Sequence, residues 1–222
     1  MRRLTIDIGN TRTKLALFEE RELVWSGEWS GEWPDAERSI VSVTGVEPAA
    51  LPAGAVRVSS ELRLPVTIDY KSPETLGSDR IAAVSGAWRR GEGGVVVIDA
   101  GTCVTVDYVD GEGVYRGGAI MPGLRMKFEA LHNFTAKLPL LYVEELPAEV
   151  DAIGKSTRES LESGVVKATR YALEKYVEEA ERREGNKVRV MVTGGDAKRV
   201  KGEWEEDEML VMRGMNEILM QN

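Results

Sequence analysis

Apolar and polar positions alternate in short runs at the start of the chain. Residues 4–8, 14–18 and 23–28 form three strand-like runs, separated by polar turns. Runs of this length bounded by turn residues predict β-strands, and the short turns predict antiparallel pairing of neighbours. We therefore expect the chain to begin with a three-stranded meander.

The same order of runs comes back in the second half of the chain. Residues 95–98, 104–109 and 114–116 repeat the meander, and aligning Asp7 with Asp99 also superposes Gly9 on Gly101. A later buried strand ending in Thr-Gly also occurs twice, as IVSVTG at 40–45 and VMVTGG at 190–195. Two matches in the same order favour a duplicated domain. We place the boundary near Gly94, giving domains 1–94 and 95–222.

Three segments carry the spacing of amphipathic helices. Residues 79–90 place Ile81, Val84 and Trp88 on one face. Residues 156–184 open with a Ser-x-x-Glu capping box and end at Gly185, and residues 209–220 predict a final short helix. Strands mixed with helices predict an α/β protein.

Charge and composition exclude several classes of function. With 37 acidic and 29 basic residues among 222, the net charge of −8 offers no electrostatic footprint for nucleic acid. No run approaches the roughly 20 apolar residues that span a bilayer, and the start lacks the pattern of a signal peptide. Cys103 is the only cysteine, which fits a reducing compartment. We expect a cytoplasmic protein with neither nucleic acid nor membrane as partner.

The turn after the first strand has the chemistry of a phosphate site. A glycine lets the backbone approach a ligand, amide and hydroxyl side chains donate to phosphate oxygens, and Lys14 adds positive charge. Asp7, at the strand end, could hold Mg²⁺ directly or through water. An ordinary hairpin turn is the alternative. The candidate phosphate-site residues in this turn are Asp7, Gly9, Asn10, Thr11 and Lys14.

A second strand-end carboxylate and Gly-Thr turn stand at Asp99, Gly101 and Thr102. Two related hairpins of this kind are expected if they grip one polyphosphate. Neither the P-loop pattern GxxxxGK[ST] nor the dinucleotide pattern GxGxxG occurs. A nucleotide site in this chain is therefore of another kind.

An ordered set of motifs resembles type III pantothenate kinase. Each motif alone is weak, but the order along most of the chain is specific. The principal matches are Asp7-x-Gly-Asn-Thr-x-x-Lys14, Gly77-x-Asp-Arg80, Asp99-Ala-Gly-Thr-x-x-Thr105-x-Asp107, Gly117-Gly-x-Ile-x-Pro-Gly123 and the VTGGD at 192–196.

The resemblance implies a fold and an activity. The fold is that of actin-like ATPases: two duplicated ribonuclease-H-like domains, each a mixed five-stranded sheet with flanking helices, and ATP in the cleft. The activity is transfer of the γ-phosphate of ATP to pantothenate, giving 4'-phosphopantothenate in the first step of coenzyme A biosynthesis. The family uses Mg²⁺ with ATP and a monovalent cation, K⁺ or NH₄⁺, and works as a homodimer.

The resemblance also implies roles for single residues. Asp79 matches the general base, Asp99 the monovalent-cation ligand, and Thr102 an ATP contact, beside the turn from Asp7 to Lys14. The residues that match pantothenate contacts are Tyr70, Gly77, Ser78, Asp79, Arg80 and Thr157.

Plainer roles stay open for some of these residues. The fork of Arg80 suits the carboxylate of pantothenate, but Arg80 could instead pair with a surface acid. Asp79 could simply favour a helix N-terminus, and Thr157 could serve only as a first-turn residue.

Two rival functions compete with the kinase. A non-catalytic regulatory or binding homologue would keep the fold without turnover, but the intact Lys14, Asp79, Arg80 and Asp99 count against it. A ribonuclease-H-like nuclease would use strand-end carboxylates to hold two metals, but it would need a basic groove that the charge of −8 does not suggest. The kinase therefore ranks first.

Overall fold

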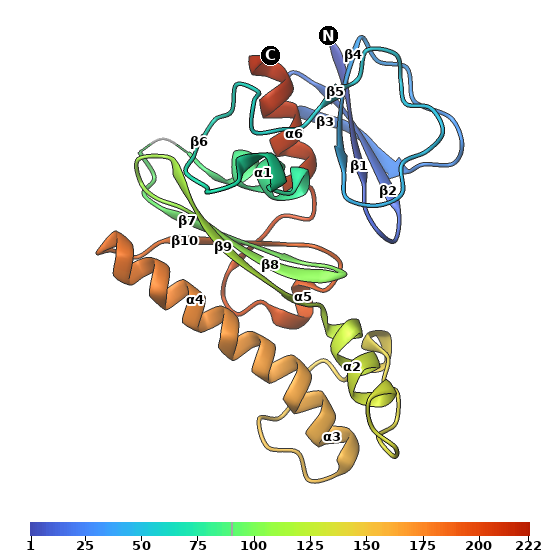
Figure 1. The fold of residues 1–222 in the computed structure, drawn as a ribbon, viewed down its shortest axis with the longest axis vertical. Helices are drawn as coiled ribbons and strands as arrows, with labels where there is room; N and C mark the ends of the chain where they lie inside the picture. Colours follow the sequence, from blue (N-terminus) through green and yellow to red (C-terminus); the bar gives the residue numbers. More distant parts are fainter. Residues whose placement is uncertain (90) are drawn as a thin grey trace. The chain divides into compact units, whose positions relative to one another are not determined.

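A computed structural model describes residues 1–89 and 91–222 of the chain (Figure 1). The chain divides into two compact units, each built from separate segments. The first unit comprises residues 1–95, 107–117 and 209–222, and the second comprises residues 96–106 and 118–208. The first unit thus includes two segments that lie beyond the predicted boundary near Gly94, and the boundary itself stays a prediction.

The first unit contains a mixed five-stranded sheet, as predicted. Its strand order is β3-β2-β1-β4-β5, with antiparallel pairing between β1, β2 and β3 and parallel pairing of β4 with both β1 and β5. The predicted meander is confirmed by the first three strands. The strands are β1 (Arg2–Ile8), β2 (Thr13–Glu19), β3 (Glu22–Glu28), β4 (Arg38–Val43) and β5 (Val56–Arg57).

Alternation along β1 sets which side chains enter the core of this sheet. Leu4, Ile6 and Ile8 are buried in one apolar cluster, because successive residues of a strand point to opposite faces. Trp29 and Trp33 pack against the same cluster, with their rings stacked 4.9 Å apart. This packing fixes the end of β1, where Asp7 lies.

Helices α1 (Ser78–Ala87) and α6 (Leu210–Gln221) cross at two glycines. A Cβ atom on Gly86 would lie 2.9 Å from the Gly214 nitrogen, and one on Gly214 would strike the carbonyl oxygen of Ala82. The close approach therefore requires glycine on both helices. The predicted helix over 79–90 is confirmed to Ala87, and its last residue, Arg90, lies outside the described residues.

We expect Gly214→Ala to lower the free energy of unfolding by about 3 kcal/mol, because the new methyl group meets backbone that cannot move aside cheaply. Urea unfolding followed by circular dichroism measures the change. Gly164→Ala is the matched control, since its Cβ would meet no atom within 4 Å, and it should be neutral or stabilising by about 0.5–1 kcal/mol. Equal effects of the two substitutions would contradict this account of the crossing.

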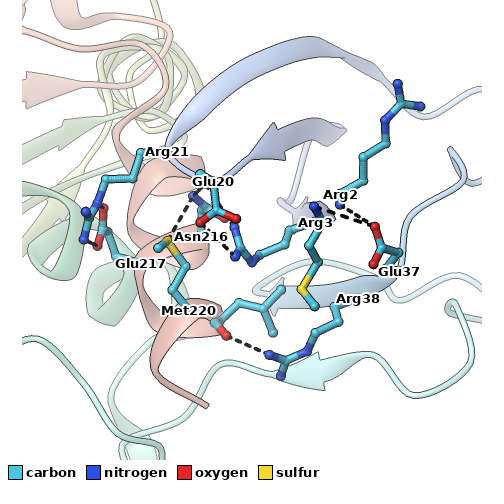
Figure 2. A network of polar contacts seen from close by, with 11 residues as sticks. Arg2, Arg3, Glu20, Arg21, Glu37, Arg38, Asn216, Glu217 and Met220 are labelled. Atoms are coloured by element: carbon cyan, nitrogen blue, oxygen red, sulfur yellow. Dashed lines mark hydrogen bonds and ion pairs between the residues drawn. The ribbon is translucent and has the colours of Figure 1, made fainter.

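Polar contacts join α6 to the first strands of the sheet (Figure 2). Glu20 has a left-handed backbone with φ of 53°, and its carbonyl oxygen accepts hydrogen bonds from Arg3 (3.1 Å) and Asn216 (2.8 Å). Arg21 donates two more, at 2.8 and 3.1 Å, to the carboxylate of Glu217. The end of the chain is thereby tied to the sheet that carries Asp7.

The second sheet has six strands, in the order β11-β10-β7-β8-β9-β6, so the predicted five strands are wrong here. The extra strand is β6, which pairs with the start of β9 in parallel. Its two residues are too few to show alternation, so no sequence pattern predicts it. The strands are β6 (Thr67–Ile68), β7 (Val95–Ala100), β8 (Cys103–Val109), β9 (Val114–Pro122), β10 (Arg189–Thr193) and β11 (Glu205–Glu206).

The long helical segment of the second unit begins and ends where the sequence predicts. The Ser156 hydroxyl accepts from the Glu159 amide at 3.2 Å, while the Glu159 carboxylate accepts from Lys155 rather than from Ser156. Gly185 ends the segment with φ of 75°. A π-helical turn (Ser163–Lys167) divides it into α3 (Thr157–Glu162) and α4 (Ala168–Glu184), and α2 (Leu124–Asn133) and α5 (Ala197–Val200) complete the helices of this unit.

Candidate active site

Asp7 lies at the end of β1 in a partly buried position, directly across the hairpin from Lys14. Burial raises the pKa of its carboxyl to about 6, Lys14 opposes the rise, Asp79 adds to it, and a hydrogen bond from Ser42 lowers it. Asp7 and Asp79 are therefore close enough to repel one another. Two carboxylates that share a site in this way favour a bound cation.

The start of α1 is held against the end of β4. The Ser78 hydroxyl lies 3.0 Å from the Ser42 hydroxyl and accepts from the Val43 amide at 3.0 Å. Asp79 follows in the first turn, where its Oδ1 accepts from the Arg80 amide at 2.8 Å. A Cβ on Gly77 would lie 2.5 Å from that oxygen, so a side chain there would displace the Asp79 carboxylate. These contacts place the Gly77–Arg80 motif beside Asp7.

Arg80 pairs with an acid, but not with a surface acid. Its guanidinium and the Asp107 carboxylate are both buried, with an ion-pair distance of 2.7 Å. Burial lowers the pKa of the Arg80 guanidinium, and the Asp107 carboxylate raises it. The net result is a pKa above the ordinary value for arginine. Tyr115 donates to Asp107 at 2.8 Å, and its ring centroid lies 5.9 Å from that of Tyr70. Tyr70 is thereby placed next to the Arg80 network.

The hairpin turn after β1 exposes its polar side chains. The Gly9 amide donates to the Arg12 carbonyl at 3.1 Å, which closes the turn. Asn10 and Thr11 are exposed at its tip, where they could donate to a ligand. The predicted phosphate turn therefore has its donors on the surface, close in sequence to the partly buried carboxylate of Asp7.

The second unit holds the related turn. Gly101 donates to the Cys103 carbonyl at 2.9 Å, and a Cβ on Gly194, which has φ of 95°, would lie 2.5 Å from the Asp99 carboxylate. Thr102 is exposed beside this turn. Only a glycine at 194 lets the loop after β10 come this close to Asp99.

The structure thus groups the predicted site residues in two sets. Ten lie in the first unit, at the end of β1 and its turn and around the start of α1: Asp7, Gly9, Asn10, Thr11, Lys14, Tyr70, Gly77, Ser78, Asp79 and Arg80. The second unit contains Asp99 and Thr102 at its turn and Thr157 as the exposed first residue of α3.

Sequence reasoning gave no role to three side chains that contact this first set. Ser42 lies in the IVSVTG run and Tyr115 on a predicted strand, but nothing in either pattern marks a site residue. Asp107 stands inside a quoted motif, but its spacing gave no role because its partner, Arg80, is 27 residues away. In the second unit, burial and Glu144 raise the pKa of Asp196, which is likewise a residue without an assigned role.

The donor set fits Mg²⁺ better than a protein-caged metal. Among residues 1–89 and 91–222 there is no cluster of three or more His, Cys, Asp or Glu side chains able to hold a metal ion. Mg²⁺ commonly uses one or two carboxylates together with substrate phosphates and water. Asp7 and Asp79 could supply the carboxylates.

Across the same residues, every helix is too short or too polar to cross a membrane.

Solved structures of other proteins have the same fold. The chain aligns with a Baf family transcriptional activator from Campylobacter jejuni at a TM-score of 0.66, with 21% identity and coverage of 99% and 98% of the two chains. It also aligns with (R)-2-hydroxyglutaryl-CoA dehydratase component A of Acidaminococcus fermentans at a TM-score of 0.56, with 14% identity and coverage of 98% and 96%. The two mixed sheets with flanking helices form an α/β fold that these two proteins share.

Carboxylates at a strand end and a helix start, beside a polar turn, are groups of the kind that a phosphotransferase uses to position a nucleotide. A sequence profile of type III pantothenate kinase matches residues 48–179. Curated type III pantothenate kinases from Phocaeicola vulgatus and Bacteroides fragilis strain YCH46 are 37% and 36% identical, each over 99% of this chain and 98% of the relative. The chain belongs to the type III pantothenate kinase family.

Proposed function

We propose that this chain transfers the γ-phosphate of ATP to the primary hydroxyl of pantothenate, with Asp79 as the general base. The phosphorylation of pantothenate in coenzyme A biosynthesis is the activity of the family to which the chain belongs. The observation that carries the residue assignment is the placement of Asp79 at the start of α1, within electrostatic reach of Asp7 at the end of β1.

Phosphoryl transfer asks the protein mainly for positioning, charge neutralisation and one group that receives the proton of the attacking hydroxyl. Within the described part of the chain, the Asp79 carboxylate accepts one hydrogen bond, at Oδ1 from the Arg80 amide. That bond fixes the orientation of the carboxylate and leaves Oδ2 to accept the hydroxyl proton. A general base in this position typically contributes a rate factor of about 10²–10⁴.

ATP is assigned to the two polar turns. Asp7 is the Mg²⁺ ligand, directly or through water, because its raised pKa marks a carboxylate that gains from a nearby cation. Mg²⁺ held there together with ATP would neutralise charge on the phosphate oxygens. Lys14 adds a positive charge opposite Asp7. The proposed ATP contacts are Asp7, Gly9, Asn10, Thr11, Lys14 and Thr102.

Pantothenate is assigned to the start of α1. Its carboxylate is a bidentate partner for the guanidinium of Arg80, and its hydroxyl is presented to Asp79. Tyr70 supplies an aromatic surface beside the Arg80 network. The proposed pantothenate contacts are Tyr70, Gly77, Ser78, Asp79, Arg80 and Thr157.

Equivalent hydrogen bonds in the two turns support our proposal that the units descend from one duplicated ribonuclease-H-like domain. Gly9 and Gly101, which are 92 positions apart, each donate to a carbonyl two or three residues ahead. The carbonyls of Ile8 and Ala100, also 92 apart, each accept from the loop after a later strand, from Gly45 and Asp196 respectively. Ordered repetition of such details is expected of a duplication.

The remaining parts of the proposal concern the monovalent cation and assembly. Asp99 is the proposed ligand for K⁺ or NH₄⁺, and the enzyme is proposed to act in the cytoplasm as a homodimer. If Asp99 holds the cation, Asp99→Asn should remove stimulation by K⁺ or NH₄⁺ while leaving a basal rate.

ADP release in the presence of Mg-ATP tests the proposal, with and without pantothenate and with and without K⁺ or NH₄⁺. We expect release that depends on pantothenate and rises with the cation in the wild type, and no cation response in Asp99→Asn. Pantothenate-independent release, or none from a folded protein that binds ATP, would point instead to another acceptor or to a non-catalytic homologue.

A further inference from the structure

A buried polar network surrounds the guanidinium of Arg80 in the first unit. Arg80 Nε donates to Asp107 Oδ1 at 2.9 Å, and Nη2 lies 2.7 Å from the same oxygen. The Tyr115 hydroxyl donates to that oxygen as well, at 2.8 Å. The exposed fractions are 7% for Arg80, 1% for Asp107 and 0% for Tyr115. The three side chains come from three elements, α1, β8 and β9, and their contacts join these elements.

The network is incomplete as it stands. All three contacts converge on Oδ1 of Asp107, and within the described part of the chain Asp107 Oδ2 and Arg80 Nη2 are buried without a hydrogen-bond partner. Buried polar groups in native proteins are nearly always satisfied, so each exception needs an explanation. A contribution to stability does not explain them, because well-packed apolar residues often stabilise a fold as much as a buried ion pair does.

We infer that Asp107 and Tyr115 are positioning residues that hold the Arg80 guanidinium in one orientation for the carboxylate of the acceptor. This inference rests on the proposed function, in which Arg80 contacts that carboxylate. An arginine fork binds a carboxylate well only in a defined plane. The Asp107 carboxylate fixes the orientation of one edge of the Arg80 guanidinium, and the Tyr115 hydroxyl fixes the orientation of Asp107. The guanidinium therefore does not have to reorient when the substrate carboxylate binds.

Asp107→Asn tests the inference, because it keeps the shape of the side chain and removes its charge. We expect KM for pantothenate to rise on the order of 10-fold or more, since small losses of alignment weaken binding strongly, while kcat and KM for ATP change much less. Pantothenyl alcohol, which lacks the carboxylate, serves as second acceptor or competitive inhibitor. Its affinity should change little, so the preference for the acid over the alcohol should shrink.

Tyr115→Phe tests the second positioning residue with less risk to folding, because the ring and the ion pair remain. Loss of one hydrogen bond should raise KM for pantothenate about 2- to 10-fold. Asp69→Asn is the matched control: Asp69 also pairs with an arginine, Arg116 at 2.8 Å, but its side chain is 66% exposed. Its kinetics should match the wild type.

Two outcomes would overturn the inference while leaving the kinase intact. One is an unchanged KM for pantothenate in both folded variants. The other is an equal loss of affinity for the acid and the alcohol, which is the result expected of a purely structural pair. Absence of pantothenate-dependent ADP release from the wild type is a different result, because it would overturn the proposed function itself.

Discussion

Asp79→Asn is expected to lower kcat for pantothenate phosphorylation by a factor of about 10²–10⁴, the usual contribution of a general base. The amide keeps an oxygen that can accept from the Arg80 backbone, so the start of α1 should stay in place. KM for pantothenate should change far less than kcat. The rate of ADP release at saturating pantothenate and Mg-ATP measures the effect.

The control for this substitution is Glu74→Gln. Glu74 is an exposed acid in the short 3₁₀ helix (Pro73–Thr75) that precedes the motif. Its loss alters the net charge of the same region without touching the proposed base, and activity should be retained. An Asp79→Asn enzyme with wild-type kcat would show that the proton leaves by another route.

Asp7→Asn is expected to abolish most of the activity and at the same time to stabilise the protein at alkaline pH. Activity falls because the proposed ligand of Mg²⁺ is lost. Stability rises because Asp7 has a pKa of about 6 in the folded state against an ordinary value of 3.8. Its ionised form is thus disfavoured by folding, by about 3 kcal/mol above pH 6.

The sign of the pH dependence follows from the raised pKa. Well below pH 3.8 Asp7 is protonated in both folded and unfolded chains, so wild type and Asp7→Asn should be equally stable. As pH rises from about 4 to 6, the wild type loses stability and the variant does not. Urea unfolding at about pH 3 and pH 8 with EDTA measures this difference. Asp79→Asn should recover part of it, because Asp79 contributes to the rise.

Added Mg²⁺ provides the second arm of this experiment. Binding to the folded wild type stabilises it by mass action, so the advantage of Asp7→Asn at pH 8 should shrink as Mg²⁺ is added. A difference in stability that is the same at both pH values would contradict the assigned environment of Asp7. A difference unaffected by Mg²⁺ would contradict only the assigned metal site.

Local patterns in the sequence predicted much of the first unit because its strands and helices carry clear alternation or helical spacing of apolar residues. Alternation over residues 2–28 and the spacing of Ile81 and Val84 were enough to predict β1 to β3 and α1. Short or irregular elements were not predictable. β6 has two residues, and the π-helical turn interrupts the helical spacing, so that the buried positions after it are Thr169, Leu173, Val177 and Ala180.

Candidate site residues could be named where a residue type stands at a turn or a helix start, as for Asp7, Gly77 and Asp79, and their roles stay predictions. It was not predictable where function depends on contacts between distant segments. Arg80 was expected to face a ligand or a surface acid, whereas its partner is a buried carboxylate on β8. Pairing across elements is set by packing, which a single sequence does not record.

The most direct test of the central claim is identification of the product by ³¹P NMR. Purified protein with Mg-ATP, K⁺ and pantothenate should produce ADP together with an equal amount of a phosphomonoester whose phosphorus couples to a CH₂ group, as in 4'-phosphopantothenate. Asp79→Asn should yield neither signal on the same timescale. Inorganic phosphate in place of the ester, or an ester that forms without pantothenate, would contradict the proposed transfer.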